Sequence, residues 1–427
     1  MQDSVSNQKA KKTSPTPKAI FSRLAPAGLL LGLSLSAFPA LAADENSEKT
    51  NGAEPEGFTE CLVRLEQAAI KAGVSAKTAT EVMSKVRYVD RVIELDRRQP
   101  EFTTTFADYF NRRVSDDRIQ KGRKLLLTHR ELLNRVTRDT GVPAPYLVAF
   151  WGLETNFGSF FGRMSVPDSL STLACDERRS EFFTKQLVAA LQIIDEGAIP
   201  ADQMEGSWAG AMGHFQFMPT VFLKQAVDAD GDGRRDLWNS LPDAMMSAGR
   251  FLQSMGWDGK YRWGREVVLP DNFDFSLSDG RRLPLTEWRN MGIKDAFGRP
   301  LAQADVKAKL IVPAGHRGPA FLAYDNFKVI MGWNRSEFYA IAVGHLADRV
   351  AGAGGLHVPP PKDLRALSRD QVLKLQQMLA DGNYYSGEID GILGSGTRSA
   401  IRKYQSANKL VADGYPGPEV LKSAGVE

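Results

Sequence analysis

A single carboxylate lies near the end of the apolar stretch VPAPYLVAFWGLETNFG, which runs from Val142 to Gly158. No Lys or Arg lies within several residues of Glu154. Apolar surroundings and the negative end of a helix dipole both disfavour a carboxylate anion, so both raise the pKa of this group. A carboxylic acid that stays protonated near neutral pH can act as a general acid. The alternative is a structural glutamate that pairs with an arginine from elsewhere, such as Arg163 or Arg179.

A second stretch, EGSWAGAMGHFQFMPTVF, runs from Glu205 to Phe222 and is rich in glycine and alanine. Small residues allow a ligand to approach the backbone closely. Ser207 and Gln216 add side chains that form hydrogen bonds. By itself, this stretch is equally consistent with an ordinary glycine-rich loop.

A third stretch, DADGDGRRD, places carboxylates at positions 1, 3, 5 and 9 of a loop that begins at Asp228, with Gly233 at the sixth position. This is the first half of a calcium-binding EF-hand loop. The glutamate usual at position 12 is missing, and Asn239 occupies its place. The alternative is a surface Asp-Gly turn whose acids are neutralised by Arg234 and Arg235.

Helices must position these stretches. Apolar periodicity predicts helices within residues 58–73, 115–141, 178–197, 241–257 and 334–352. Pro143 and Pro145 favour a helix start before Glu154, and Gly158 can end that helix. Between Arg265 and Ala320, short β-rich runs and Gly/Pro turns predict a small mixed α/β insert. The fold class is therefore mainly α.

The first residues are typical of a secretory signal peptide over residues 1–42, with a basic leader, a short apolar run and the small-residue site ALA. An uncleaved amphipathic anchor is the alternative, and the run is too short to span a membrane. Five of the 54 basic and one of the 51 acidic residues lie in this segment, so the remainder has a net charge of about −1. Nothing in that balance favours nucleic-acid binding.

Residues 43–57 are polar, and we expect them to be disordered. Export to an oxidising compartment favours a disulfide between the two cysteines, Cys61 and Cys175. Two separately buried thiols are the alternative. A proline-rich linker is predicted at residues 355–366, between a catalytic domain over 58–354 and a C-terminal domain over 367–427.

The C-terminal domain contains an internal repeat, DGILGSGTRSAI from Asp390 and DGYPGPEVLKSA from Asp413, and three short helices. Each Asp-Gly makes a tight turn, and the next glycine precedes a helix. The segment LQQMLADGNYYSGEIDGILGSGTRSAIRKYQ, followed by DGYPGP, resembles the peptidoglycan-binding domain of cell-wall enzymes. That resemblance implies a three-helix domain that binds the wall; a helical capping domain is the alternative.

The stretches GLETNFG and GSWAGAMGHFQFMP together resemble the B-type lytic murein transglycosylases, from about Phe58 to Arg349. The resemblance implies a lysozyme-like fold for the helical lobe. It also implies cleavage of the β-1,4 bond between N-acetylmuramic acid and N-acetylglucosamine, with formation of a 1,6-anhydromuramic end. No water needs to be activated in that reaction, so one carboxylate can suffice where most glycosidases use two.

The same resemblance assigns roles to individual residues. Glu154 matches the catalytic acid and base, and Ser207 and Gln216 match residues that bind substrate in the groove. Asn334 matches an asparagine that helps to orient the N-acetyl group. Trp333 departs from the family, which often has a tyrosine there, so its role is left open.

The resemblance also implies that a later aspartate closes the acidic loop, and Asp243 is the candidate. The predicted ligands of a structural calcium ion are then Asp228, Asp230, Asp232, Arg234 and Asp243. No cofactor is expected for the chemistry itself.

Two other functions remain open. A hydrolytic muramidase would need a second carboxylate, for which Asp168 and Glu205 are candidates; a non-catalytic wall-binding scaffold would need none. In each case we expect a monomer in the periplasm that binds peptidoglycan glycan strands and has no stable membrane span. Other cell-wall enzymes are further candidate partners.

Overall fold

The computed structural model describes residues 54–98 and 104–426. The predicted signal peptide and most of the predicted polar segment lie outside these ranges. Among the described residues, no helix is both long enough and apolar enough to cross a membrane.

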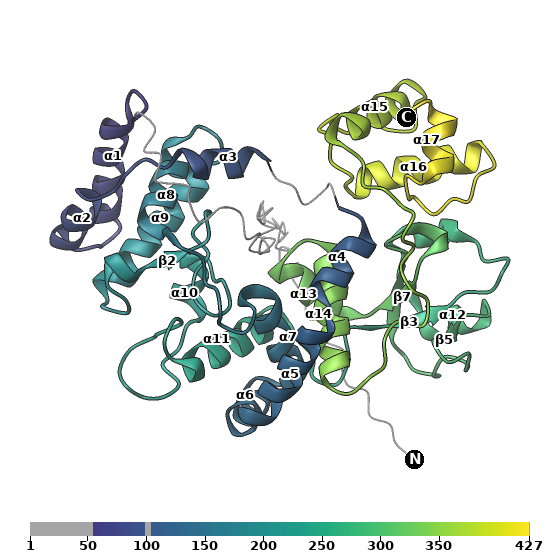
Figure 1. Cartoon of the computed structure of the whole chain (residues 1–427), viewed down its shortest axis with the longest axis horizontal. Helices are drawn as coiled ribbons and strands as arrows, with labels where there is room; N and C mark the ends of the chain where they lie inside the picture. Colours follow the sequence, from purple (N-terminus) through teal and green to yellow (C-terminus); the bar gives the residue numbers. More distant parts are fainter. Residues whose placement is uncertain (1–53, 99–103, 427) are drawn as a thin grey trace, which may run out of the picture. The chain divides into compact units, whose positions relative to one another are not determined.

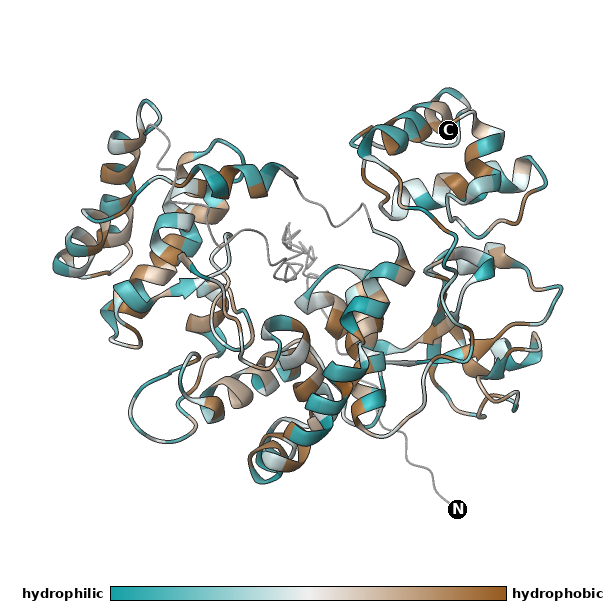
Figure 2. Cartoon of the chain, viewed as in Figure 1, coloured by the Kyte–Doolittle hydropathy of each residue, from teal (hydrophilic) through white to brown (hydrophobic). Residues whose placement is uncertain are grey.

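Helices dominate the described part of residues 58–350 (Figure 1). Most of them are amphipathic, with hydrophobic and hydrophilic residues along the same helix (Figure 2). Outside the insert they are α1 (Phe58–Lys71), α2 (Ala76–Met83), α3 (Asp90–Arg98), α4 (Phe106–Arg113), α5 (Asp116–Thr128), α6 (Arg130–Thr140), α7 (Ala144–Thr155), α8 (Val166–Cys175), α9 (Ser180–Asp195), α10 (Pro219–Gln225), α11 (Leu241–Ser254), α13 (Asp325–Trp333) and α14 (Glu337–Val350).

Helix α7 is the buried centre of this lobe, and every residue from Tyr146 to Thr155 is buried. It packs against α14 and α5. The helix ends earlier than Gly158, because Asn156 adopts a left-handed conformation with φ 50°. Asparagine tolerates this region better than most residues, since its short polar side chain can form local hydrogen bonds. The prediction that Gly158 ends the helix was therefore wrong by two residues.

The single helix predicted over residues 115–141 was also wrong. It divides into α5 and α6 at His129, which has φ −104° and ψ 24°. Neither proline nor glycine marks the break. The two halves have different partners, since α5 packs on α7 and α14 whereas α6 packs mainly on α11. Tertiary packing therefore decides this boundary.

The insert is a five-stranded antiparallel sheet in the order β4-β6-β7-β3-β5 with its own core, which is centred on the fully buried Trp288. Its elements are β3 (Gly264–Val268), β4 (Leu283–Pro284), α12 (Leu285–Asn290), β5 (Lys294–Asp295), β6 (Lys307–Ile311) and β7 (Ala320–Ala323). A separate two-stranded sheet pairs β1 (Met164–Ser165) with β2 (Glu205–Gly206). That pairing fixes the start of the glycine-rich stretch.

The C-terminal domain has α15 (Arg369–Asp381), α16 (Ser395–Ala407) and α17 (Pro418–Ala424) around a separate small core. Gly391 and Gly414 both have φ 75°, as tight Asp-Gly turns require. Gly394 and Gly417 are the N-caps of α16 and α17. The two halves of the repeat therefore have the same local structure.

A disulfide joins Cys61 of α1 to Cys175 at the end of α8, across 114 residues of sequence. It ties the first helix to the helical lobe.

Candidate active site

Glu154 lies in the last turn of α7 and is only 7% exposed. Burial raises the pKa of its carboxyl group to about 7, against smaller opposing effects from a hydrogen bond with Tyr339, the charge of Arg113 and a hydrogen bond with Trp333. The hydroxyl of Tyr339, on α14, donates a hydrogen bond to Glu154 Oε1. Near neutral pH this carboxyl group is therefore partly protonated, as a general acid must be.

The arginines considered as structural partners lie elsewhere. Arg163 is exposed, and Arg179 forms an ion pair with Asp96. Over residues 54–98 and 104–426, no ion pair within 4.0 Å joins Glu154 to a Lys or an Arg. Arg113 of α4 acts on Glu154 through its charge and places its guanidinium 5.6 Å from the ring centre of Tyr109.

Tyr339 is a site residue that sequence reasoning missed. It is 2% exposed and lies in the first turn of α14, where Ser336 caps the helix by accepting a hydrogen bond from the Tyr339 amide at 3.3 Å. Burial, together with the nearby charge of Glu154, raises the pKa of the Tyr339 hydroxyl well above 10. The hydroxyl thus remains a donor in both charge states of the acid.

The end of α7 is fastened to the glycine-rich stretch. Thr155 Oγ1 donates to the carbonyl oxygen of His214 at 2.8 Å and accepts from the Gly158 amide at 3.0 Å. Trp151 Nε1 donates to His214 Nδ1 at 2.9 Å. Burial lowers the pKa of His214 to about 4, so the imidazole is neutral and can accept this bond. These bonds hold the loop against the helix that carries Glu154.

Ser207 and Gln216 are half-buried and hold the loop together internally. Ser207 Oγ accepts from the Ala211 amide at 3.1 Å, which leaves its hydroxyl proton for another acceptor. Gln216 has φ 49°, and its Nε2 donates to the carbonyl oxygen of Phe161 at 2.9 Å. The side-chain oxygen of Gln216 takes no part in this hydrogen bond.

Asn334 is 2% exposed and lies between α13 and α14, where its Oδ1 accepts from the Ser336 amide at 3.0 Å. The neighbouring Trp333 packs against Phe150 of α7, with ring centres 4.6 Å apart, and against Phe215, at 6.2 Å. The segments that carry Glu154, Gln216 and Asn334 are thereby packed around one indole. Within the described residues, no hydrogen bond joins Ser207 to these three side chains.

The two candidates for a second carboxylate are not coupled to Glu154. Asp168 accepts a hydrogen bond from the Arg87 amide at 3.1 Å, and burial raises its pKa. Glu205 is exposed, and its backbone carbonyl accepts from Trp238 Nε1 at 3.2 Å. Within the part of the chain that the structure describes, the groups that shift the pKa of Glu154 include no carboxylate.

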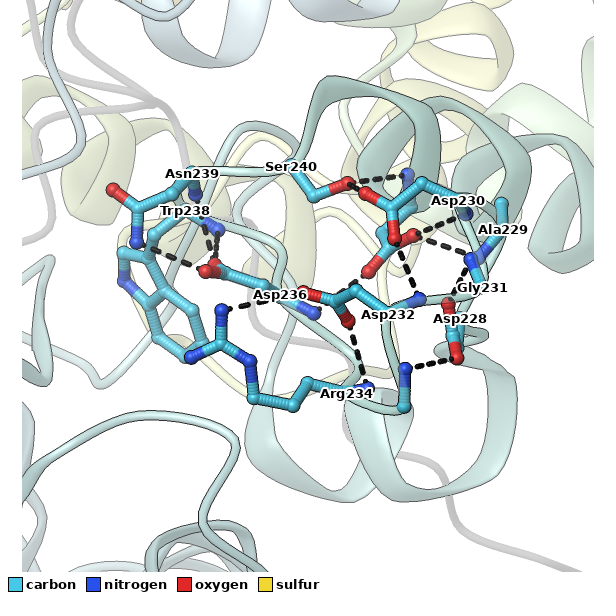
Figure 3. A network of polar contacts seen from close by, with 12 residues as sticks. Asp228, Ala229, Asp230, Gly231, Asp232, Arg234, Asp236, Trp238, Asn239 and Ser240 are labelled. Carbon is cyan, nitrogen blue, oxygen red and sulfur yellow. Dashed lines mark hydrogen bonds and ion pairs between the residues drawn. The ribbon is translucent and has the colours of Figure 1, made fainter.

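The acidic loop gathers three of the predicted calcium ligands (Figure 3). Asp228, Asp230 and Asp232 each offer a carboxylate oxygen, and these oxygens lie within 4.8 Å of one another. Carboxylate oxygens are the donors that calcium prefers, so this set fits the ion. Arg235, considered as a neutralising residue, pairs with Glu196 instead; Arg234 does pair with Asp232, at 3.3 Å.

Asp243 was predicted as a calcium ligand, but it does not lie in this cluster of three aspartates. It is fully buried on α11, and its Oδ1 accepts from the amides of Ala229, at 2.7 Å, and Asp230, at 3.3 Å. Its Oδ2 accepts from the Asp236 amide at 2.9 Å. Asp243 therefore braces the loop from behind through backbone amides.

Comparison with known proteins identifies both parts of the chain. Residues 57–348 match the family profile of a transglycosylase SLT domain, and residues 368–423 match that of a putative peptidoglycan binding domain. Membrane-bound lytic murein transglycosylase B of Escherichia coli is 27% identical over 304 residues, which are 67% of this chain and 81% of that protein.

Solved structures agree with these matches. SltB3 from Pseudomonas aeruginosa, crystallised with NAG-anhNAM-pentapeptide, has a TM-score of 0.84 and 42% identity over 87% of this chain and 100% of its own. The Escherichia coli lytic transglycosylase Slt35, in complex with calcium, has a TM-score of 0.57 and 27% identity over 70% of this chain and 94% of its own. With its buried acid inside the matched region, this chain belongs to the family of peptidoglycan-cleaving lytic transglycosylases.

Proposed function

We propose that Glu154 is the only acid and base in the reaction of this lytic transglycosylase, and that cleavage leaves a 1,6-anhydromuramic end. The observation that carries the proposal is the burial of Glu154, which raises its pKa to about 7 with a tyrosine hydroxyl as its hydrogen-bond partner. A group with a pKa near the working pH can both give and take a proton.

The proposed reaction has two steps. Glu154 first protonates the glycosidic oxygen, and the bond between that oxygen and C1 of the muramic sugar breaks. The N-acetyl group of the substrate, oriented by Asn334, meets the positive charge that develops at C1. The Glu154 carboxylate then removes the proton of the muramic 6-hydroxyl, whose oxygen bonds to C1, so the enzyme recovers its starting state.

Each neighbouring group has a part in these steps. The Tyr339 hydroxyl donates to Oε1 and stabilises the carboxylate that the first step produces. Arg113 favours the same anion through its charge. The side-chain oxygen of Gln216 and the hydroxyl proton of Ser207 are the groups that form hydrogen bonds with the sugar.

Two observations favour this chemistry over hydrolysis. Among residues 54–98 and 104–426, no carboxylate shifts the pKa of Glu154. The related SltB3 was crystallised with a ligand that contains an anhydromuramic sugar. The non-catalytic scaffold is disfavoured because a buried carboxyl group of raised pKa destabilises the fold at neutral pH, so a chain that only binds would gain by losing it.

Mass analysis of the products from purified sacculi tests the proposal. We expect soluble muropeptides with anhydro ends from the wild type, none from Glu154→Gln, and unchanged products from the control Asp168→Asn. Products that are one water heavier would establish a muramidase instead. Anhydro products released by Glu154→Gln at the wild-type rate would remove Glu154 from the mechanism.

We further propose that the protein is exported to the periplasm by residues 1–42 and binds the wall through its C-terminal domain. The substrate supports this location, because peptidoglycan lies outside the cytoplasmic membrane. Cell fractionation of chains with and without residues 1–42 tests the export signal. Retention of the shortened chain in the cytoplasm is the expected result, and equal export of both chains would contradict it.

We also propose a structural calcium ion at Asp228, Asp230 and Asp232. The donor set supports it, as does the relative that was crystallised with calcium. The ion would neutralise three clustered carboxylates and stiffen the loop that precedes α11.

A further inference from the structure

The two Asp-Gly turns of the C-terminal domain are built in the same way internally. Asp390 Oδ1 accepts from Gln376 Nε2 at 2.9 Å, and Asp413 Oδ1 accepts from Gln405 Nε2 at 2.7 Å. In both turns the same oxygen also accepts, at 2.8 Å, from the backbone amide two residues later. The glutamine oxygen in turn accepts from the amide of the turn glycine, at 2.8 Å in both cases.

The turns differ in the use of their second carboxylate oxygen. Asp413 Oδ2 accepts from the backbone amide of His316 at 2.8 Å and contacts His316 Nδ1 at 2.7 Å. His316 belongs to a short 3-10 helix (Gly315–Arg317) in the insert of the catalytic domain. Within residues 54–98 and 104–426, no hydrogen bond or ion pair reaches the second oxygen of Asp390.

Further contacts surround the Asp413 turn. Arg402 of α16 donates through Nη2 to the carbonyl oxygen of Ser278 at 2.6 Å, and Ser278 Oγ lies 3.4 Å from the Asp413 carbonyl oxygen. A Cβ atom on Gly315 would lie 2.7 Å from Asp413 Oδ2, and Gly315 has φ 69°. The contact therefore requires glycine at that position, both for space and for its backbone conformation.

We propose that the second Asp-Gly turn is a docking element, which fixes the peptidoglycan-binding domain to the insert of the catalytic domain through the carboxylate of Asp413 and the imidazole of His316. The first turn has the same internal structure but no such contact. This assignment goes beyond the catalytic proposal and does not depend on it, because docking is a structural property that can be measured without substrate.

The chemistry of the pair makes docking depend on pH. The hydrogen bond with Asp413 raises the pKa of His316, against a smaller effect of burial; Glu419 favours the imidazolium and Arg317 opposes it. Burial would raise the pKa of Asp413, but hydrogen bonds from His316 and neighbouring groups lower it. The negative charge of Asp413 also raises the pKa of Arg402, against the larger lowering effect of burial.

The sign of the dependence follows from these directions. The contribution of His316 to the free energy of docking is complete below the pKa of a free histidine, about 6.5. It is lost as pH rises through the higher pKa that His316 has in the docked state. Asp413 contributes to docking as the anion, and this contribution is lost as pH falls through its lowered pKa. Docking is therefore strongest in weakly acidic solution and weakens in alkaline solution.

A matched pair of variants tests the assignment in the full chain. Asp413→Asn and Asp390→Asn make the same change in twin turns, and an Asn keeps the internal acceptor oxygen in each. In Asp413→Asn, however, the charged oxygen that faces the backbone amide and Nδ1 of His316 is replaced by an NH₂ group or a neutral oxygen. At pH 6 we expect a larger radius of gyration in X-ray scattering for Asp413→Asn only. We also expect hydrogen exchange of the His316 amide to be about tenfold faster or more, since hydrogen bonds to charged groups contribute at that level.

Each result of these experiments either supports or refutes the docking role. Equal radii and exchange rates for the two variants would overturn the docking role of Asp413. If Asp413→Asn loses helical circular dichroism, His316→Ala decides instead, because it leaves the C-terminal domain unchanged: an increased radius supports docking and an unchanged radius refutes it. The wild-type radius should also increase between pH 6 and pH 9, and a constant radius would refute the role of the imidazole.

Discussion

At the scale of single residues, the site depends on the cost of burying a charge. Burial is the largest influence on Glu154, and it outweighs three groups that favour the anion. The acid could be identified from the sequence because a carboxylate among apolar helical residues is visible in the chain itself. Tyr339 could not, because it lies 185 residues away in the sequence, in a helix whose residue pattern does not distinguish it from its neighbour Phe338.

The pH profile should reflect the pKa of Glu154, which is about 7. The first step needs the protonated acid, so kcat/KM on soluble glycan chains should fall tenfold per pH unit well above that value. Initial rates between pH 5 and pH 9 measure this. A rate that stays level up to pH 9 would mean that another group donates the proton.

The raised pKa of Glu154 should also make the free energy of unfolding depend on pH. The pKa of Glu154 rises from 4.5 to about 7 on folding, so the stability linked to its protonation is complete below pH 4.5 and is lost as pH rises through 7. Glu154→Gln should therefore become more stable than the wild type by up to about 3 kcal/mol at pH 9, but not at pH 4.5. Urea unfolding at both values measures the difference. A difference that does not vary with pH would contradict the raised pKa.

Tyr339→Phe removes one hydroxyl and keeps the ring that packs near Phe150. The Glu154 anion loses a donor, so the descending limb of the pH profile should move to higher pH. We expect kcat to fall about tenfold or more, because the anion is the product of the first step. A lower kcat with an unmoved pH profile would indicate a purely structural role for the hydroxyl.

At the scale of elements, the site depends on how α7 ends and on what holds the following loop. Thr155, Trp151 and His214 join the helix to the glycine-rich stretch, and the Trp333 indole packs against both. Local signals predicted most helices in this region well, because apolar periodicity and caps act over a few residues. They failed at His129, where two different packing partners divide one continuous pattern.

Calcium removal tests the acidic loop. Three clustered carboxylates repel one another without a cation, so a chelator should lower the Tm in low salt, and added calcium should restore it. Asp230→Asn should reduce the effect of the chelator, whereas Asp295→Asn, in strand β5 of the insert, should not. A Tm that the chelator leaves unchanged would make the loop an Asp-Gly turn only.

At the scale of the whole molecule, the chain contains a transglycosylase SLT domain and a putative peptidoglycan binding domain. The division could be predicted from the sequence, because the linker and the repeat are local patterns. The contacts between His316 and Asp413 could not, since 97 residues separate two side chains that have ordinary surroundings in the sequence.

Truncation after Leu356 removes the linker and the C-terminal domain. Turnover of soluble glycan chains should be largely unchanged, because Glu154 and its partners lie before residue 350. Binding to sacculi should weaken, and a sedimentation assay measures it. Undiminished sedimentation would take the wall-binding role away from the C-terminal domain.

The sequence by itself determined the lone acid, the glycine-rich stretch, the Asp-Gly turns and the helical class, since each of these depends on residue types within a short span. Only the tertiary structure decided that Tyr339 is the partner of Glu154, that Asp243 supports the acidic loop from behind, and that one of two twin turns docks on another domain. The physical reason is the same in each case. A hydrogen bond or an ion pair depends on distance in space, and distant segments approach one another only when the chain buries its apolar faces.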